Sequence, residues 1–390
     1  MNKIIYFDNN ATTRVSPEVK EAMDLFLTEL YGNPSSIHQF GGQVKKHLEA
    51  ARGRVASLLG CQPEEVIFTS CGTESDSTAI YSAINTFPEK KHIVTTSVEH
   101  PAIYNLCRYL ERQGYRVTYL SVDKEGQLDL NELEKALGPE TALVSIMWAN
   151  NETGVVLPVE KAAEIAHEKG VLFHTDAVQA AGKIPINLAG SRIDLLSISG
   201  HKLHAPKGIG VLYVRQGTKF VPFLRGGHQE NGRRAGTENV PGIIGLGTAS
   251  QLALNNLERE QSYVGQLRDR LERGLLERIP DIKINGARAR RLPNTLSVSF
   301  EFVEGESILL LLSDYGICAS TGSACSSGSL EPSHVLQAMK IPFTFAHGTI
   351  RFSLSIYNTE EEVDYVLEVL PGVIKKLRDI SPFSSASSAR

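Results

Sequence analysis

The sequence has no large excess of either charge, since 40 Lys and Arg against 44 Asp and Glu give a formal net charge of -4. A chain without a basic excess is poorly suited to hold nucleic acid or an anionic membrane. Long hydrophobic runs are also lacking, because the longest apolar stretch, around residues 308–312, is far too short to span a bilayer. Residues 1–10 turn polar too early for a secretory signal. We therefore expect a cytoplasmic protein with neither nucleic acid nor membrane as a partner.

Cysteine pairs are missing as well. The five cysteines form no Cys-x-x-Cys motif, and their odd number in a chain this long does not suggest a disulfide framework or a structural zinc site. One of them, Cys325, stands among residues with very small side chains, in the run Thr321-Gly-Ser-Ala-Cys325-Ser-Ser-Gly. A structural cysteine normally has apolar neighbours. This setting instead predicts an accessible thiol on a mobile loop, able to enter a pocket and leave again.

Short apolar, β-branched runs alternate with segments of helical spacing between about residues 65 and 215. This pattern is typical of a mostly parallel sheet with helices on its faces, an α/β fold. Two helices are expected at 103–112 and 159–168. The strands are expected at 66–68, 93–95, 117–120, 143–147, 171–174, 195–198 and 210–214.

Leucines with helical spacing then predict a long helix from about 243 to 277 that links two domains. Further segments predict a smaller α+β domain, with strands at 295–300 and 350–354 and helices at 307–312, 334–339 and 360–377.

The length of 390 residues favours two domains, because one core does not close comfortably at this size. We assign residues 14–258 to a large domain and residues 1–13 and 259–383 to a small domain that carries the Cys325 loop. The Ser/Ala-rich segment 384–390 is expected to be a disordered tail.

Polar residues follow several of the predicted strands, and in an open parallel sheet ligands bind beyond the carboxyl ends of the strands. Gly72 and Thr73 open a helix after the first strand, where backbone amides suit an anion. Taken singly, each cluster has an ordinary explanation as a helix cap, a turn or a solvated lysine. The further candidates are His100, Asn150, Asn151, Asp176, Gln179, Ser199, His201 and Lys202.

Together these clusters are better explained by one site. A phosphate site, an acid for a ring nitrogen and a lysine for a Schiff base are what pyridoxal phosphate requires of a protein. The residues therefore predict pyridoxal 5'-phosphate as the cofactor, with Lys202 and Asp176 in the last two roles.

The sequence also resembles a known family, the cysteine desulfurases, which have the class V aminotransferase fold and depend on pyridoxal phosphate. Within it, the segments around residues 69–77 and 227–230 and the short Cys325 loop are most similar to the nitrogen-fixation (NifS-like) branch, although Gly72 stands where many relatives carry Ala. The motifs that carry the resemblance are Asp8-Asn-Asn-Ala-Thr-Thr13, Gly32-Asn-Pro-Ser-Ser36, Thr73-Glu-Ser, Glu99-His-Pro-Ala102, Asn150-Asn-Glu-Thr-Gly154, Asp176-Ala-Val-Gln179, Gly200-His-Lys202, Arg233-Arg-Ala-Gly-Thr237 and Gly322-Ser-Ala-Cys325.

The resemblance implies fold type I of the pyridoxal phosphate enzymes, with a mostly parallel seven-stranded sheet, and a role for each matching residue. The catalytic residues would be Cys325, Lys202 and His100. Cofactor binding would fall to Gly72, Thr73, His100, Asn151, Asp176, Gln179, Ser199, His201, Lys202 and, from the other subunit of a homodimer, Thr237. The substrate would be bound by Arg351, Asn33 and Asn151.

The implied reaction converts L-cysteine to L-alanine. Lys202 would remove the α-proton, the Cys325 thiolate would take the sulfur as a persulfide, and an iron–sulfur scaffold protein would accept it. Cys325 would then also be a transient ligand of an iron–sulfur cluster shared with the scaffold. Alternatives are a selenocysteine lyase, an aminotransferase in which Cys325 has no role, and a sulfur carrier or scaffold-binding protein without turnover, which would not need the complete set of catalytic residues.

Overall fold

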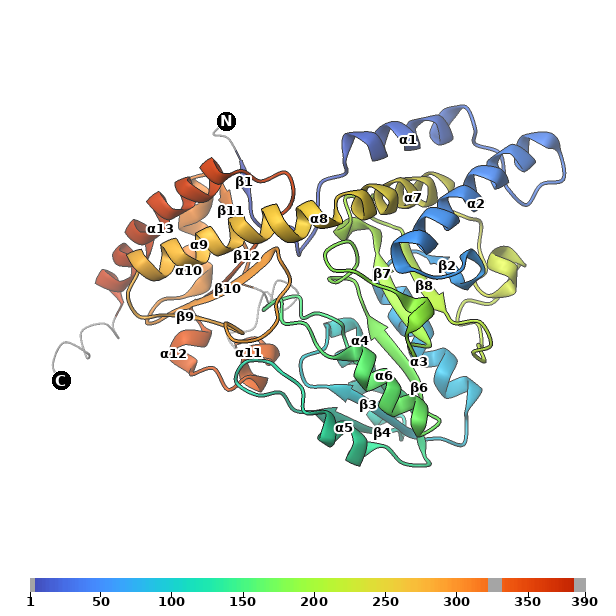
Figure 1. The fold of residues 1–390 in the computed structure, drawn as a ribbon, viewed down its shortest axis with the longest axis horizontal. Helices are drawn as coiled ribbons and strands as arrows, with labels where there is room; N and C mark the ends of the chain where they lie inside the picture. Colours follow the sequence, from blue (N-terminus) through green and yellow to red (C-terminus); the bar gives the residue numbers. More distant parts are fainter. Residues whose placement is uncertain (1–3, 322–331, 382–390) are drawn as a thin grey trace.

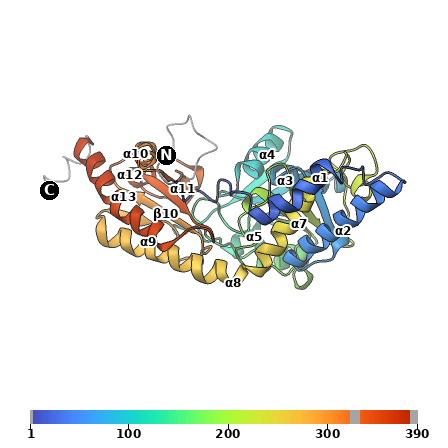
Figure 2. The same ribbon diagram turned by 90° about the horizontal axis from the view of Figure 1, so that it is seen from above.

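The computed structural model describes residues 4–321 and 332–381. Cys325 and the predicted tail 384–390 lie outside the described residues. Within them, the strands form three sheets. Figure 1 and the perpendicular view in Figure 2 show the elements gathered in two groups joined by one line of helices, α7 to α9.

The largest sheet has seven strands in the order β2-β8-β7-β6-β5-β3-β4. Only β8 runs against its neighbours, β2 and β7, so the predicted mostly parallel sheet is confirmed. All strands except β8 therefore end at the same edge. Their bounds are β2 (Val66–Thr69), β3 (His92–Thr96), β4 (Arg116–Leu120), β5 (Thr141–Ser145), β6 (Leu172–Asp176), β7 (Leu195–Ser199) and β8 (Gly210–Val214).

Alternating side chains of this sheet enter two different cores, as the period of a β-strand requires. Val66 and Phe68 of β2 pack into the core beneath α2 (Gln39–Leu59), α6 (Val159–Glu168) and α7 (Val240–Asn255). Ile67, between them, packs into the opposite core with α3 (Gly72–Thr86) and α4 (Pro101–Arg112). Burial on both faces explains why the strands read as continuous apolar runs in the sequence.

A second group of elements surrounds a separate apolar core. The N-terminal strand β1 belongs to it, because Ile5 and Phe7 are buried in this core and Ile5 pairs in parallel with Ile317. The bounds are β1 (Ile5–Tyr6), β9 (Ile282–Ile284), β10 (Thr295–Phe300), α10 (Gly305–Asp314), β11 (Ile317–Cys318), β12 (Thr349–Ser353) and α13 (Glu360–Ile380). Two further short helices, α11 (His334–Ala338) and α12 (Phe343–Ala346), bury Val335, Leu336 and Ala346 in the core of the seven-stranded sheet instead. The expected strands and helices of the C-terminal region are thus present.

The helix predicted from 243 to 277 is not continuous. It consists of α7, the short α8 (Leu257–Arg259), a π-helical turn over Glu260–Val264 and α9 (Gly265–Arg278). The break between α7 and α8 falls at Asn256, whose side chain donates a hydrogen bond to the carbonyl of Leu252 at 2.9 Å. A side chain that competes for backbone groups in this way favours the end of a helix.

No helix or strand was predicted for the first 60 residues, which contain α1 (Pro17–Thr28) and α2. The start of α1 follows standard capping, since the Ser16 side chain accepts a hydrogen bond from Val19 N and Pro17 occupies the first turn. The helix α2 ends at Gly60, whose φ of 62° lies in the left-handed region that favours glycine. The remaining helix, α5, covers Leu130–Ala136.

No helix among the described residues is long and apolar enough to cross a membrane.

Candidate active site

A cavity of about 370 Å³ lies beyond the carboxyl ends of β2, β6 and β7. Most of its lining comes from the loops after these strands, as expected for an open α/β sheet. The N-terminal segment contributes Asn10 and Ala11, and β12 of the second group contributes Arg351. Ten of the predicted site residues line it: Gly72, Thr73, His100, Asn151, Asp176, Gln179, Ser199, His201, Lys202 and Arg351.

Lys202 is placed by a 3-10 turn, Gly200–Lys202, that follows β7 directly. Its Nζ donates hydrogen bonds to the carbonyl oxygens of Asn10 at 2.6 Å and Ala11 at 2.7 Å. Burial, with the positive charges of Arg351 and Lys183, lowers the pKa of Lys202 to about 8. A buried lysine with a lowered pKa is a good candidate for a nucleophile or base, because its neutral form is more populated near physiological pH than that of an ordinary lysine.

Asp176 is the last residue of β6, and its Oδ1 accepts a hydrogen bond from Val178 N at 2.9 Å. Burial raises the pKa of Asp176, while His100 and Lys202 act in the opposite direction. His100 caps the N-terminus of α4, where its Nδ1 accepts from Ala102 N at 3.1 Å. Burial lowers the pKa of His100, so its neutral form is favoured. The Nε2 atom of His100 makes no hydrogen bond to another described residue.

The N-terminus of α3 faces the cavity through Gly72 and Thr73. The residue before them, Cys71, does not cap the helix with its side chain. A Cβ atom on Gly72 would lie only 3.0 Å from Val178 Cγ2 and 3.4 Å from Ser199 Cβ, so a glycine permits this close approach. The exposed first-turn amides and the Thr73 hydroxyl form a site suited to an anion.

Gln179 and His201 also line the cavity. Gln179 Nε2 donates to the carbonyl of Asn10 at 3.1 Å, whereas its buried Oε1 has no hydrogen-bond partner among the described residues. His201 Nδ1 lies 3.2 Å from Thr12 Oγ1. Burial, followed by nearby positive charges including Lys202, lowers the pKa of His201 to about 4. Both side chains therefore offer uncharged hydrogen-bonding groups.

Arg351 is the only cation that β12 brings to the cavity, and its side chain is 3% exposed. It donates to Asp8 Oδ1 at 2.8 Å and to the carbonyl of Asn151 at 3.0 Å. Its Nε atom is buried without a partner among the described residues. A guanidinium that keeps N–H donors without partners is suited to bind a carboxylate.

Two buried residues at the site were not singled out from the sequence. Asn10 lay within a quoted motif, but its role as a carbonyl acceptor for Lys202 is a backbone property that residue type does not reveal. Asp76 lines the cavity from α3, and its buried Oδ1 accepts no hydrogen bond from the described residues, although His174 Nε2 lies 3.7 Å away. Burial and then the charge of Asp176 raise the pKa of Asp76 well above its ordinary value. The spacing of Asp76 from Gly72 and Thr73, one helical turn, could have indicated it.

Two other predicted residues do not line the cavity. Asn33 and Thr237 are exposed and are not among its lining residues. Cys325 lies outside the described residues. Among the four described cysteines, Cys71 lines the cavity, while burial raises the pKa of Cys61 and Cys107 to about 12. The described part of the chain has no group of three or more His, Cys, Asp or Glu placed to hold a metal ion.

Comparisons with known proteins agree with this geometry. The family model for class-V aminotransferases matches residues 5–366. A cysteine desulfurase of Trichormus azollae is 60% identical over 382 residues, which cover 98% of this chain and 96% of the relative. Cysteine desulfurase NifS of Azotobacter vinelandii is 57% identical over 384 residues, again covering 98% and 96%.

Solved structures give the same result. A NifS-like protein superposes with a TM-score of 0.90 at 43% identity and covers 96% of this chain and 100% of its own. The structure described as SspA in complex with cysteine has a TM-score of 0.81 at 36% identity, covering 91% and 99%. The chain therefore belongs to the cysteine desulfurases of the class-V aminotransferase family.

Proposed function

We propose that this chain converts L-cysteine to L-alanine and transfers the sulfur to Cys325 as a persulfide. The observation that carries the proposal is the meeting of Lys202, Asp176 and Arg351 in one cavity. A lysine with a lowered pKa, an acid and a carboxylate-binding arginine are the groups that cofactor-assisted chemistry on an amino acid needs. Similarity to relatives named cysteine desulfurase supports the choice of substrate.

Pyridoxal 5'-phosphate fits the residues present. The uncapped N-terminus of α3 is suited to the phosphate, with Thr73, Ser199 and His201 around it and Thr237 of a second subunit completing it. Asp176 would hold the ring nitrogen, His100 would stack on the ring, and the free Oε1 of Gln179 would accept from the ring hydroxyl. Lys202 would bind the cofactor covalently, with Asn151 beside it. When bound, the cofactor draws electrons away from the substrate α-carbon.

Each catalytic or substrate-binding residue then has its own role in the reaction. Arg351 binds the substrate carboxylate with its fork of donors, with Asn33 and Asn151 near that carboxylate. The neutral Lys202 amine takes the α-proton. The Cys325 thiolate attacks the substrate sulfur, so that an S–S bond forms as the C–S bond breaks. The electron pair of the C–S bond stays on the substrate β-carbon, which is protonated by His100 or Lys202. The α-carbon then regains the proton that Lys202 removed, and L-alanine leaves.

Domain organisation is part of the same proposal. We assign residues 14–258 to a cofactor-binding domain, and residues 1–13 with 259–383 to a second domain that carries the Cys325 loop. The apolar cores support most of this division, since Phe7 and Phe352 share one and Leu246 belongs to the other. Residues 335–346 are an exception, because Val335 and Ala346 pack into the same core as Leu246. The cavity would then lie where the two domains meet.

We further propose a cytoplasmic homodimer that passes its sulfur to an iron–sulfur scaffold protein serving nitrogen fixation. The exposure of Thr237, away from the cavity of its own chain, supports a role in the site of a partner subunit. Cys325 would be the donor and a transient cluster ligand during transfer. Light scattering of the purified chain, with a sulfur-transfer assay to a scaffold, tests both statements.

The direct test is the reaction of purified enzyme with L-cysteine. Wild type is expected to release L-alanine and to leave no keto acid, whereas an aminotransferase would give a keto acid. Cys325→Ala should still bind cofactor and cysteine but form no persulfide. Normal sulfide release by Cys325→Ala would contradict the proposal. Faster turnover of selenocysteine than of L-cysteine would favour a selenocysteine lyase instead.

A further inference from the structure

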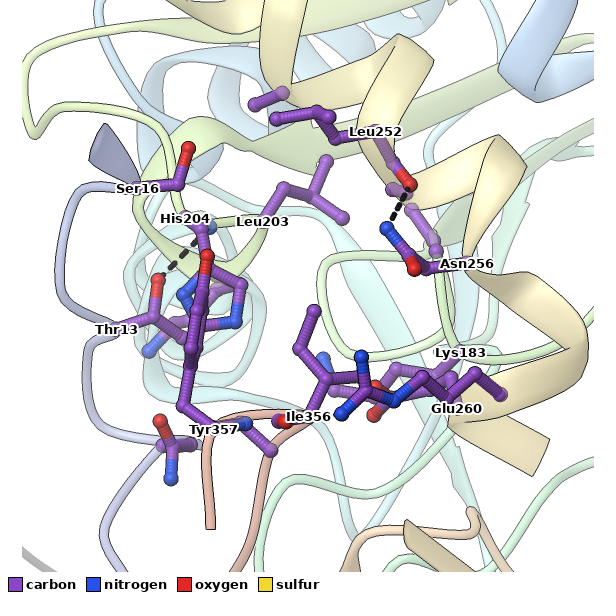
Figure 3. A pocket seen from close by; sticks show the side chains of 18 of the residues that line it. Thr13, Ser16, Lys183, Leu203, His204, Leu252, Asn256, Glu260, Ile356 and Tyr357 are labelled. Carbon is purple, nitrogen blue, oxygen red and sulfur yellow. Dashed lines mark hydrogen bonds between the residues drawn. The ribbon is translucent and has the colours of Figure 1, made fainter. Parts of the chain in front are cut away.

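A second cavity, of about 220 Å³, lies apart from the cofactor cavity and shares Lys202 with it. Figure 3 shows that its walls come from three parts of the chain. Thr13 and Ser16 come from the N-terminal segment, Lys183 from the region after β6, and Tyr357 from the region after β12. The line of helices closes the remaining side. Apart from Lys202, no residue that lines this cavity takes part in the catalytic steps above.

Lys183 is a buried, charged residue in the lining of this cavity. It is 6% exposed, and its Nζ has no hydrogen-bond partner among the described residues. Burial lowers the pKa of Lys183, and only Glu260 opposes that effect. A buried ammonium group without an acceptor is costly, and proteins normally give such a group a partner. The site therefore lacks an acceptor for Lys183.

Glu260 supplies the opposite charge from the first residue of the π-helical turn. It is 8% exposed, and burial raises the pKa of Glu260 to about 7. The described residues donate no hydrogen bond to its carboxyl group and form no direct ion pair between it and Lys183. Turns of π-helix are rare and are frequent at functional sites. The turn thus places an unpaired acid beside an unpaired base (Figure 3).

The other charged neighbours define which ligand fits. Arg259, Lys202 and the exposed Glu18 also line the cavity, and Nη2 of Arg259 donates to the carbonyl of Ile356 at 3.3 Å. Burial lowers the pKa of His204 to about 4, so this residue is neutral. An anion alone would be repelled by Glu260, and a cation alone by Lys183 and Arg259. A molecule that carries both charges satisfies each of them.

We propose that this cavity binds a small zwitterion of the amino-acid class, with its carboxylate on Lys183 and its ammonium group on Glu260. The volume of about 220 Å³ suits a small metabolite and is below that of most drug-sized pockets. Because the lining comes from both groups of elements and from the helices that join them, the bound molecule also holds these parts together. This site is independent of the proposed reaction.

The test uses the holoenzyme and N,N-dimethylglycine, a zwitterion whose tertiary amine cannot form an imine with a cofactor. Calorimetry should detect a binding event that leaves the cofactor absorbance unchanged. Lys183→Met and Glu260→Gln should each weaken it by at least about tenfold, because each removes one charge-assisted contact. Acetate, which lacks the ammonium group, should bind at least about tenfold more weakly.

Two controls are matched to these variants. Glu258→Gln changes an exposed acid two residues away, and Lys161→Met changes an exposed lysine on α6. Both should bind the probe like wild type. Lys183→Met and Glu260→Gln lie on different elements, so either one that folds tests the site. Equal binding by wild type and both variants, equal binding of acetate, or no binding of the probe would each overturn the proposal.

Discussion

The Nζ atom of Lys202 lies 2.6 Å from the carbonyl oxygen of Asn10, a residue 192 positions away in the chain. The Asn10 side chain is itself fixed, because Nδ2 donates to Thr295 Oγ1 at 2.9 Å and Oδ1 accepts from Asn294 at 2.9 Å. The segment that carries the acceptors of Lys202 is therefore anchored to the second group of elements. The position of the catalytic lysine depends on residues far from its own strand.

Asn10→Ala tests this dependence. Loss of the buried side-chain hydrogen bonds should lower the free energy of unfolding by about 2–4 kcal/mol, since Thr295 and Asn294 each lose one buried hydrogen-bond partner. The variant should also bind cofactor more weakly, as titration by absorbance would measure. Asn255→Ala, an exposed change at the end of α7, is the control. Unchanged stability and cofactor affinity in Asn10→Ala would contradict the anchoring role.

Arg351→Lys should raise the KM for L-cysteine by roughly 30-fold or more, because a lysine cannot reproduce the planar fork that binds a carboxylate. The absorbance of the lysine-bound cofactor should be retained, since Arg351 is not proposed to hold the cofactor. Steady-state kinetics and an absorbance spectrum measure the two effects. Arg270→Lys, in an exposed ion pair with Asp364, is the control. An unchanged KM in Arg351→Lys would remove this residue from substrate binding.

The two acids of the cavity should behave differently. Asp176→Asn should lower turnover by at least about 100-fold, because an amide cannot stabilise a protonated ring nitrogen as a carboxylate does. Asp76→Asn should retain most activity and be at least as stable as wild type, because burial already favours an uncharged side chain at this position. Kinetics and denaturant unfolding compare the pair. A similar loss of activity in both variants would show that Asp76 also acts as a carboxylate.

Glu99 gives the protein a predictable pH dependence. Its Oε1 accepts from Thr96 and Met147, but burial raises the pKa of Glu99 to about 8 from an ordinary value of 4.5. The folded state then holds a proton that the unfolded state has released, so stability falls as pH rises from about 4.5 to about 8, by at most about 1.4 kcal/mol per pH unit.

Glu99→Gln should remove this contribution and flatten the dependence, while it keeps one oxygen acceptor for Thr96 and Met147. Denaturant unfolding of both proteins at several pH values between 4.5 and 8 measures it. Glu140→Gln, which changes an exposed acid directly before β5, serves as the comparison. Parallel pH profiles for wild type and Glu99→Gln would show that Glu99 does not carry a proton in the folded state.

The strands and their common edge could be predicted from the sequence because both faces of the sheet are buried. Each strand then reads as a continuous apolar run, and polar residues such as Asp176 mark its end. The role of Asn10 could not be predicted in this way, since it rests on a backbone carbonyl brought to Lys202 by tertiary packing. Asn256 and the π-helical turn likewise interrupt a leucine pattern that favours one long helix. The helices α1 and α2 remained unassigned.

The assignments of Asn33 and Thr237 came from resemblance alone. Neither lines the cavity within its own chain, so the fold of one chain does not test either role. Their roles stay predictions until the oligomeric state is measured.

The measurement that tests the account most directly is mass mapping of the persulfide formed when the holoenzyme reacts with L-cysteine. Transfer of the substrate sulfur to Cys325 predicts one labelled peptide, the one that contains Cys325, and none that contains the cavity residue Cys71. Cys71→Ala should give the same map, and Cys325→Ala should give no label. A persulfide on Cys71, or normal alanine formation by Cys325→Ala, would contradict the central claim.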